Sequence, residues 1–434
     1  MDTYMRLLGS FIAFKSVSTD PAYKQEVTDT VTWLRKVFAE EGAAVEVVEG
    51  YDNPILLARF DVDPDAPRAL VYGHYDVQPA DEVDGWTHDP FVISDAAERI
   101  YGRGVVDNKG QVLVHIATVI DALHAGTLAK NVTFFLEGNE ETGSPHLADF
   151  IEHEKEKLSA DFALVSDGEV IGDTPVIETG FRGGFNATLK LTTSSTDLHS
   201  GIYGGAVPSA SHELTLLLAK LLDKEYTVMI PGFYDAVDEI SPEESKALAS
   251  VPFDREEYYR ISGVKGLMTD NVYTATGLKP TVQITGIESG YTKEGYRNSI
   301  PANARAKLNF RLVRSQDSST IIKLFQDWLG ANIPPYVTWV LDVNDPYAGV
   351  KLNPDAPFTR EAASVLEKVY GVKPVYKYSG GGLPIVTFLK EHLELEPVLV
   401  PLGNEDCNMH AVAENYSKSH LKKALAFSRE FFTH

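Results

Sequence analysis

Seven imidazole and carboxylate side chains lie in polar segments that follow apolar runs or in glycine-rich loops. His74 and Asp76 end the first such run, two residues apart. The same residue types recur at Asp107, Glu140, Glu141, Asp167 and His410. Imidazole nitrogens and carboxylate oxygens are the ligands of zinc and of similar divalent ions. Together these residues indicate the ligand set of a two-metal hydrolase.

The spacing of His74 and Asp76 suits one metal ligand and the carboxylate that orients it. At a strand end the imidazole can coordinate an ion while the carboxylate fixes the ring and its tautomer; alternatively, Asp76 is an ordinary turn residue. Asp107 either caps a helix or bridges two metal ions about 3.5–4 Å apart. The glycines of its loop, which let the backbone turn tightly, are Gly102, Gly104 and Gly110.

The adjacent carboxylates Glu140 and Glu141 are the most informative pair. Neighbouring carboxylates repel one another unless cations or protons relieve the repulsion. Their side chains diverge, so one can bind a metal while the other faces a metal-bound water and acts as its general base. The alternative is a solvated acidic loop. By themselves, Asp167 could be a turn residue and His410 a surface residue, while Cys407 is predicted to be a small buried residue rather than a ligand.

The elements that must position these residues alternate between strands and helices. Strands are predicted at residues 44–48, 55–60, 69–72, 132–136 and 162–165, with helices between several of them. This alternation indicates an α/β fold with a sheet flanked by helices. His74, Glu140 and Asp167 each follow a predicted strand, and active sites of open α/β sheets lie at the carboxyl ends of strands.

The pattern changes after about residue 180. Residues 185–193 and 306–313 alternate between apolar and polar, and a helix is predicted at 211–222. This predicts a smaller α+β insert. The predicted organisation is a catalytic domain at residues 1–182 and 351–434, interrupted by a lid or dimerisation domain at 183–350 (the lid domain below).

Composition excludes several classes of protein. The formal charge is −23, with 62 acidic against 39 basic residues, so nucleic-acid binding is a poor expectation. A single cysteine fits a reducing compartment. Neither a signal peptide nor a membrane-spanning run is visible, so we expect no membrane association and a cytoplasmic location.

The order of these motifs resembles the dinuclear zinc peptidases that include carnosinase-like dipeptidases, aminoacylase, carboxypeptidase G and succinyl-diaminopimelate desuccinylase. Residues 73–79, 84–86, 89–91 and 197–205 look most like the dipeptidase branch. The resemblance implies a zinc-peptidase-like mixed sheet with an inserted lid, and a homodimer formed through that lid. Deacylases and carboxypeptidases of the family more often carry Glu at the position of Asp167, which favours a dipeptidase here.

The resemblance also implies a role for each site residue. His74, Asp107 and Asp167 would hold one ion, and Asp107, Glu141 and His410 the other. Glu140 would be the general base and Asp76 the orienting carboxylate. His199 would reach a neighbouring subunit's active site and stabilise the oxyanion, while Arg311 would grip a substrate carboxylate, although it could also be a surface arginine. A cis peptide bond is expected between Asp107 and Asn108.

Two positions depart from the dipeptidase pattern at the substrate end: Asn298 stands where Thr is frequent, and Gly382 where Ser is expected. The predicted function is hydrolysis of the amide bond of dipeptides or short peptides by metal-bound hydroxide. The predicted cofactors are two divalent ions, zinc first, with manganese or cobalt as alternatives. The alternative activity is that of an N-acyl-amino-acid deacylase, and a third alternative is a catalytically silent binding protein on the same scaffold.

Overall fold

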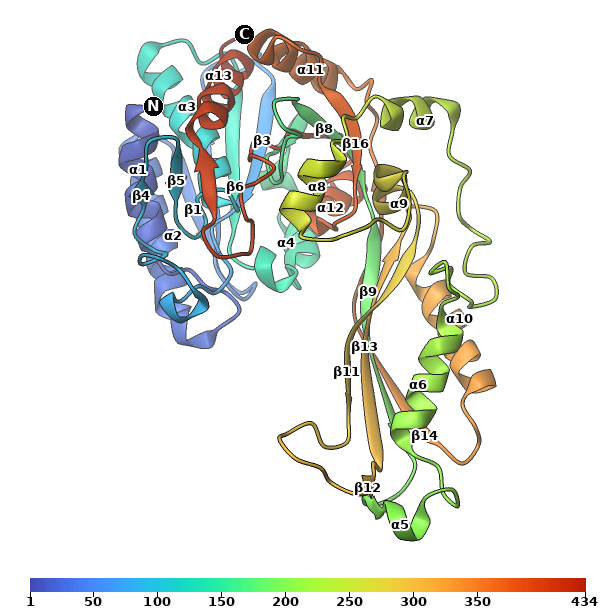
Figure 1. Cartoon of the computed structure of the whole chain (residues 1–434). Coiled ribbons are helices and arrows are strands. Elements are labelled where there is room, and N and C mark those ends of the chain that lie inside the picture. Colours follow the sequence, from blue (N-terminus) through green and yellow to red (C-terminus); the bar gives the residue numbers. More distant parts are fainter.

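The computed structural model describes residues 1–434, except the side chain of residue 345. A nine-stranded mixed sheet forms its centre, in the order β1-β2-β6-β3-β7-β17-β8-β15, and β16 also pairs with β8. The predicted α/β class is confirmed, as Figure 1 shows. The strands of this sheet are β1 (Ala44–Val48), β2 (Ile55–Phe60), β3 (Arg68–His74), β6 (Asn131–Glu137), β7 (Phe162–Val165), β8 (Val176–Phe181), β15 (Val350–Lys351), β16 (Val375–Ser379) and β17 (Pro397–Leu399).

Helices cover both faces of this sheet, because successive side chains of a strand point to opposite faces. Tyr72 and Phe135 pack with α4 (Leu147–His153) and α12 (Pro384–His392). Val71 and Phe134 pack on the other face, where the helices are α1 (Asp2–Ala13), α2 (Lys24–Glu40), α3 (Lys109–Ala125), α11 (Pro357–Tyr370) and α13 (Lys418–Thr433). Burial on both faces explains why the predicted strands are continuous apolar runs.

The parallel strands of the sheet bring several loops to one edge. β3 pairs in parallel with β6 and with β7, and β17 pairs in parallel with β7. Beside this edge, a small sheet joins the glycine-rich loop at 102–110 to the C-terminal loop that carries His410. Its strands are β4 (Ser94–Asp95), β5 (Arg99–Tyr101) and β18 (Asn415–Ser417).

The lid domain is built on a separate four-stranded antiparallel sheet. Its order is β11 (Thr281–Ser289), β13 (Asn303–Leu312), β9 (Gly183–Thr192) and β14 (Thr338–Tyr347). The helices α6 (Ala210–Leu221) and α10 (Ser318–Asn332) cover one face, where Leu189, Leu308 and Phe325 share a core. Alternation in β9 and β13 predicted this one-sided burial. The predicted boundaries at 182/183 and 350/351 stay predictions; the chain passes between the two sheets at β8–β9 and at β14–β15.

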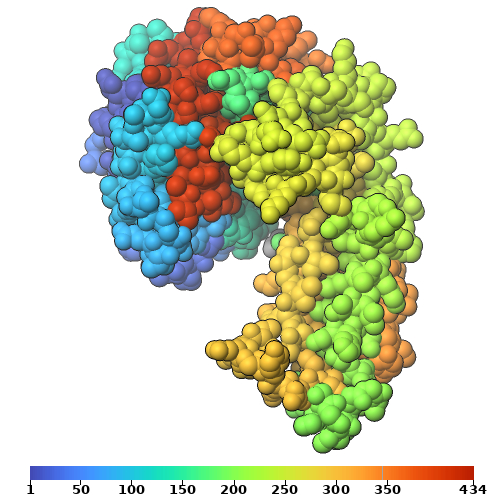
Figure 2. Space-filling model, viewed as in Figure 1, coloured from blue at the N-terminus to red at the C-terminus, as the bar shows by residue number. Residues whose placement is uncertain are grey.

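The lid extends away from the catalytic domain, as Figures 1 and 2 show. Its far end, called the lid tip below, consists of β10 (Leu198–His199), α5 (Ser200–Tyr203), β12 (Ser299–Ile300) and residues 290–298. Three further helices of the inserted segment are α7 (Pro242–Ala249), α8 (Arg255–Ser262) and α9 (Val272–Gly277). Of these, α7 and α9 contact β16 of the catalytic domain. Among the described residues, none of the helices is both long and apolar enough to cross a membrane.

Candidate metal centre

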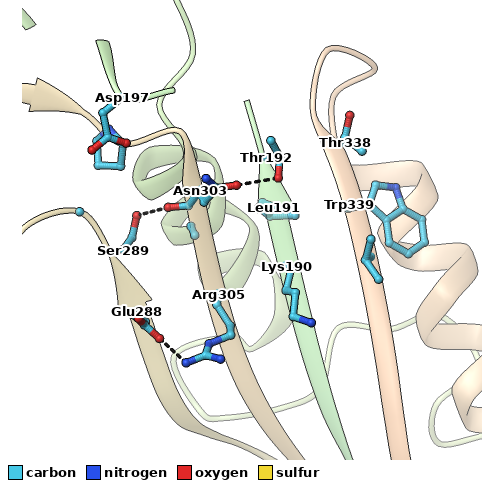
Figure 3. A pocket seen from close by; sticks show the side chains of 14 residues that line it. Lys190, Leu191, Thr192, Asp197, Glu288, Ser289, Asn303, Arg305, Thr338 and Trp339 are labelled. Atoms are coloured by element: carbon cyan, nitrogen blue, oxygen red, sulfur yellow. Dashed lines mark hydrogen bonds and ion pairs between the residues drawn. The ribbon is translucent and has the colours of Figure 1, made fainter. Parts of the chain in front are cut away.

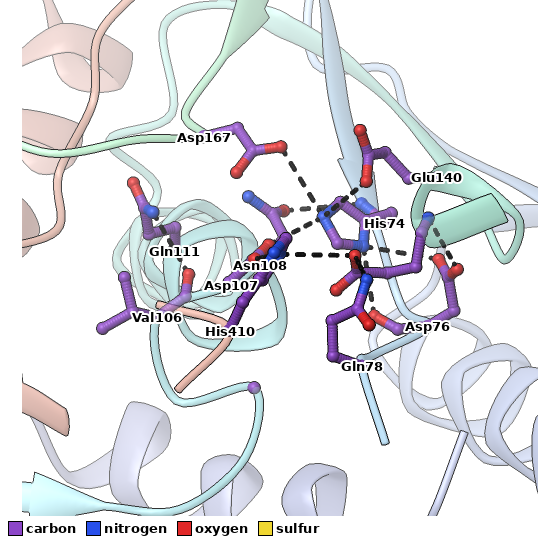
Figure 4. Close-up of polar contacts among 12 residues, drawn as sticks. His74, Asp76, Gln78, Val106, Asp107, Asn108, Gln111, Glu140, Asp167 and His410 are labelled. Carbon is purple, nitrogen blue, oxygen red and sulfur yellow. Dashed lines mark hydrogen bonds and ion pairs between the residues drawn. The ribbon is translucent and has the colours of Figure 1, made fainter. Parts of the chain in front are cut away.

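The predicted ligands converge at the carboxyl ends of the parallel strands. His74 ends β3, Glu140 and Glu141 follow β6, and Asp167 follows β7. Asp107 comes from the loop before α3, and His410 from the loop after β17, so the last ligand arrives from the far end of the chain. Figure 4 shows the side chains of His74, Asp107, Glu140, Asp167 and His410 pointing toward one another.

Asp107 joins the ligands into two groups of three. His74, Asp107 and Asp167 form one group, and Asp107, Glu141 and His410 form the other, with the ligand atoms of each group within 4.8 Å of one another. Asp107 Oδ1 lies 3.1 Å from His74 Nε2, while Asp107 Oδ2 lies 2.7 Å from His410 Nε2. Each carboxylate oxygen of Asp107 therefore faces a different group, which is the arrangement expected of a bridging ligand.

Asp76 supports both groups without belonging to either. The Nδ1 atom of His74 lies 3.1 Å from the carbonyl oxygen of Asp76 and 3.3 Å from its Oδ1. Asp76 Oδ2 accepts hydrogen bonds from the Glu141 backbone N–H at 3.1 Å and from the Ser18 hydroxyl at 2.6 Å. Asp76 thus orients the imidazole of His74 and holds the loop that carries Glu141.

Glu140 and Glu141 point in different directions, as their adjacency predicted. The side chain of Glu141 is 2% exposed and lies 3.3 Å from His410 Nε2. The side chain of Glu140 is 20% exposed, lies 4.0 Å from His74 Nε2 and lines an open cavity of about 340 Å³. Glu140 is therefore the carboxylate placed to exchange protons with a group in the cavity.

The electrostatics of the site favour a cation. Burial, followed by the charge of Asp107, raises the pKa of Glu141 to about 7. Burial also raises the pKa of Glu140 well above its usual value, with Asp167 and Asp107 adding to the effect. Burial disfavours a charged His74, but hydrogen bonds to Asp107, Asp167 and Asp76 outweigh it and raise the pKa of the imidazole. Protons thus relieve the repulsion that metal ions would relieve when bound.

The donor set fits divalent ions. Two imidazole nitrogens and three carboxylates suit zinc, and also manganese or cobalt. In addition, Glu141 Oε1 is buried without a hydrogen-bond partner among the described residues. A buried acceptor of this kind is costly unless it has a partner, and a ligated cation supplies one.

Three supporting residues were not predicted as part of the site. Gln78 Nε2 donates to Glu141 Oε2 at 2.6 Å, and Asn108 Nδ2 donates to the carbonyl oxygen of Ser166, next to Asp167, at 2.7 Å. Gln78 stood within the recognised segment 73–79 but had no assigned role. The Asp107–Asn108 peptide bond is cis, as predicted.

The third residue, Glu414, holds the loop that presents Asp107. Its carboxylate is fully buried and accepts hydrogen bonds from the backbone N–H groups of Gly104, Val106 and Asp107 at 2.9, 2.9 and 3.1 Å. It also accepts one from Arg103 Nη1 at 2.7 Å. Its only sequence signal was its position four residues after His410.

The remaining predicted residues lie in two places: His199 and Asn298 are at the lid tip, apart from the ligands of the same chain, whereas Gly382 and Arg311 lie nearer to those ligands. His199 is exposed at the lid tip, and Asn298 lies beside it, where its carbonyl oxygen accepts from Ser200 N at 3.1 Å. Gly382 lines the cavity of the candidate ligands, and Arg311 lies in β13 near the start of the lid. Cys407 is buried, as predicted, and its thiol donates to Glu169 Oε1 at 2.9 Å.

A larger cavity, about 550 Å³, lies on the open face of the lid sheet near the tip (Figure 3). Several polar side chains that line it are bonded to one another: Arg305 pairs with Glu288, and the Thr192 hydroxyl donates to Asn303 Oδ1 at 2.8 Å. The chemistry expected of a hydrolase is therefore concentrated in the smaller cavity beside Asp107.

Comparison with known proteins agrees with this fold. The Cys-Gly metallodipeptidase of Saccharomyces cerevisiae is 30% identical over 437 residues, covering 93% of this chain and 89% of that protein. The crystal structure of human carnosine dipeptidase 1 has a TM-score of 0.87 at 28% identity, covering 100% of this chain and 95% of that one. An M20 family metallo-carboxypeptidase from Sulfolobus solfataricus has a TM-score of 0.91 at 28% identity, with 100% and 99% coverage. The sequence model of peptidase family M20/M25/M40 matches residues 70–434, so this chain belongs to that family and is a peptidase-like hydrolase.

Proposed function

We propose that the protein is a dinuclear metal-dependent dipeptidase. The observation that carries this proposal is the position of Asp107 between two ligand groups, with Glu140 facing the adjoining cavity. The third alternative, a silent binding protein, is not supported, because the relatives are named peptidases and the base and all five candidate ligands are present.

The residues that would hold the two ions are those of the two groups. His74, Asp107 and Asp167 would hold one, and Asp107, Glu141 and His410 the other. When bound, such ions polarise the scissile carbonyl and lower the pKa of water near neutrality. Zinc is the ion we expect, and manganese and cobalt suit the same ligands.

Glu140 acts as the general base and then as the general acid in this proposal. Its carboxylate takes a proton from the attacking water and later delivers it to the leaving amine. The raised pKa of Glu140 suits this role, because an acid that titrates closer to neutral pH can both accept and donate a proton. Asp76 keeps the His74 ring in place throughout.

The lid tip supplies the remaining group in trans. His199 is exposed, and the tip lies apart from the metal centre of its own chain (Figure 1). We therefore propose a homodimer in which His199 stabilises the oxyanion in the partner subunit's active site. Asn298 accompanies it, since Ser200 N donates to the Asn298 carbonyl at 3.1 Å.

Dipeptides are the proposed substrates. Relatives are named for the dipeptides Cys-Gly and β-Ala-His, and Arg311 would bind the carboxylate of such a substrate. The alternative, an N-acyl-amino-acid deacylase, would use the same metal centre. A cytoplasmic location stays a prediction.

A substrate comparison tests this proposal. Protein stripped of metal and reloaded with zinc or manganese is assayed on a free dipeptide and on the same dipeptide with an acetylated amine. We expect the free dipeptide to be hydrolysed faster, and removal of the metal to abolish activity. Preference for the acetylated substrate would instead establish the deacylase.

Substitution of the general base tests the mechanism. Glu140→Gln should lower kcat by about 10²- to 10⁴-fold and leave two metal ions bound, as measured by elemental analysis. Glu152→Gln, an exposed position on α4, is the matched control and should keep full activity. Near-normal turnover of Glu140→Gln would refute the assigned role.

A further inference from the structure

The cavity beside the candidate ligands has one wall made by the loop after β16. Gly381 and Gly382 of this loop line the cavity. The φ angle of Gly382 lies outside the left-handed region, so the backbone conformation does not require glycine. The neighbouring Tyr347 does: a Cβ atom at 382 would lie 2.5 Å from Tyr347 Cζ and closer still to its hydroxyl oxygen. Tyr347 thus occupies the space that a side chain at 382 would need.

Tyr347 and Arg311 meet across a glycine of the lid sheet. Arg311 of β13 and Tyr347 of β14 both pair with Gly184 of β9, from opposite sides. Residues in register on neighbouring strands place their side chains on the same face, and Gly184 has no side chain there. Arg311 Nη1 accordingly donates to the Tyr347 oxygen at 2.7 Å. Because this oxygen accepts, the Tyr347 hydroxyl proton is available for a third group.

Arg182 adds a second guanidinium beside the loop after β16. Its side chain is buried, and its Nε and Nη2 atoms donate to the Gly380 carbonyl at 3.1 and 3.0 Å. In the described part of the chain, the hydrogen bonds of Arg182 and Arg311 go only to uncharged oxygens. Burial, and then the charge of Arg311, lowers the pKa of Arg182 to about 10. Two guanidiniums without a carboxylate partner, beside the loop that lines the cavity, favour the binding of an anion.

Resting on the proposed function, we propose that Tyr347 is a positioning residue for the free carboxylate of a dipeptide substrate. Its ring fills the space left by Gly382 and its oxygen holds Arg311 in place. Its hydroxyl group then donates a hydrogen bond to the substrate carboxylate and keeps its proton. A C-terminal amide is uncharged and replaces one of the two acceptor oxygens by an NH2 donor, whereas the guanidiniums and the hydroxyl all need acceptors, so the arrangement selects for the acid.

The first test removes only the hydroxyl. Tyr347→Phe should raise KM for a free dipeptide by about 10- to 100-fold, as expected when a hydrogen bond to a charged group is lost. The value of kcat should stay within about two-fold, and KM for the dipeptide amide should not change. The control is Tyr378→Phe on β16, whose hydroxyl donates to Glu244 Oε1 at 3.2 Å and whose loss should change neither KM. An equal effect of Tyr347→Phe on acid and amide, or no effect on either, would overturn the proposal.

The second test uses the contact between positions 382 and 347. Gly382→Ala should displace the tyrosine ring and raise KM for the acid as Tyr347→Phe does. Adding Gly382→Ala to Tyr347→Ala should cause little further loss, because the ring that clashes is gone. Additive losses in the double variant would show that the two positions act independently and would contradict the inference.

Failure of the proposed function can be told apart from failure of this inference. If the metal-loaded wild-type protein hydrolyses neither substrate, the proposed function is wrong. In that case the Tyr347→Phe test uses dissociation constants of the same dipeptide and its amide, measured by calorimetry, in place of KM. Tyr347→Phe should weaken binding of the acid alone, and equal weakening of both would overturn the inference.

Discussion

Two histidines of this chain, His74 and His199, lie in opposite surroundings. His74 is fully buried at the end of β3, among carboxylates that raise the pKa of its imidazole. His199 is exposed at the lid tip, where its Nδ1 accepts only a local hydrogen bond from Gly201 N at 3.1 Å. The buried imidazole is surrounded by groups that need a cation, whereas the exposed one needs a substrate or a second chain to act upon.

The apolar surface around each region differs in the same way. The catalytic edge is enclosed by core residues on both faces of the sheet. The lid tip exposes Ile202 by 71% and Tyr296 completely, and exposed apolar side chains that cluster on one surface mark contact sites. The comparison teaches that the metal centre is assembled within one chain, while the proposed oxyanion group depends on association.

The largest effect is expected at the residue shared by both ligand groups. Asp107→Asn should remove both metal ions and lower kcat by at least about 10⁴-fold. His410→Ala should weaken one site only, because His410 belongs to a single group. Elemental analysis of the purified variants measures the difference. Two retained ions in Asp107→Asn would show that Asp107 does not bridge.

The next effect tests the lid tip. His199→Ala should lower kcat by about 10²- to 10³-fold through loss of oxyanion stabilisation, without loss of metal. Mixing it with Glu140→Gln should restore activity if His199 acts in trans. If the subunits exchange at random, half of the dimers contain one copy of each variant. In such a dimer, one of the two sites has both an intact Glu140 and an intact His199 from the other subunit. About a quarter of wild-type activity is therefore expected.

The control for this experiment is each variant mixed with itself, which should stay inactive. Sedimentation measures whether the mixed species is a dimer. If mixed dimers form and no activity returns, the role in trans is wrong. Full activity of the wild type as a dilute monomer would contradict it equally.

A smaller effect is expected behind the metal centre. In Glu414→Gln, one of the two carboxylate oxygens that accept from backbone N–H groups becomes an NH2 group, which cannot accept. The loop that carries Asp107 should therefore lose its fixed position. Metal affinity should fall by about 10- to 100-fold, as is usual for residues that orient ligands. Metal titration measures it, and Glu361→Gln, which disturbs the ion pair with Lys130, is the control. Unchanged affinity would mean that Glu414 has only a structural role.

The smallest effect concerns the stability of the metal-free protein. Glu141 has a folded-state pKa of about 7 against an ordinary value of 4.5, so the native state binds its proton more tightly than the unfolded state does. Its contribution to stability is therefore present below pH 4.5 and is lost as the pH rises to about 7. Between about pH 5 and 8 we expect a loss of about 2 kcal/mol, which bound metal should prevent.

Denaturant unfolding at several pH values, with and without metal, measures this prediction. Glu141→Gln should remove part of the pH dependence, because it carries no titrating proton. A metal-free protein whose stability rises across this range would contradict the assigned protonation. The exposed lid tip should contribute little to the pH dependence of stability, either with or without metal.

Much of the catalytic centre could be predicted from local sequence. His74, Glu141 and Asp167 each follow a short apolar strand, and the strand's burial on both faces makes that pattern readable. Chemistry then distinguishes ligands from ordinary turn residues, because imidazole and carboxylate groups recur at several strand ends. In the lid, β9 and β13 were readable from alternation, whereas β11 and β14 were not predicted; β11 contains a register shift between Ile284 and Gly286.

The sequence by itself determined the α/β class, the candidate ligands and the candidate general base, because each depends on residue type and on short-range pattern. Only the tertiary structure decided what holds them. Glu414 meets Arg103 across 311 positions of the chain, and Tyr347 meets Arg311 through strand register on either side of Gly184 rather than through any motif. The separation of His199 from the metal centre is likewise a matter of domain placement. Contacts between distant segments arise from the way sheets pair and pack, and no local spacing encodes them.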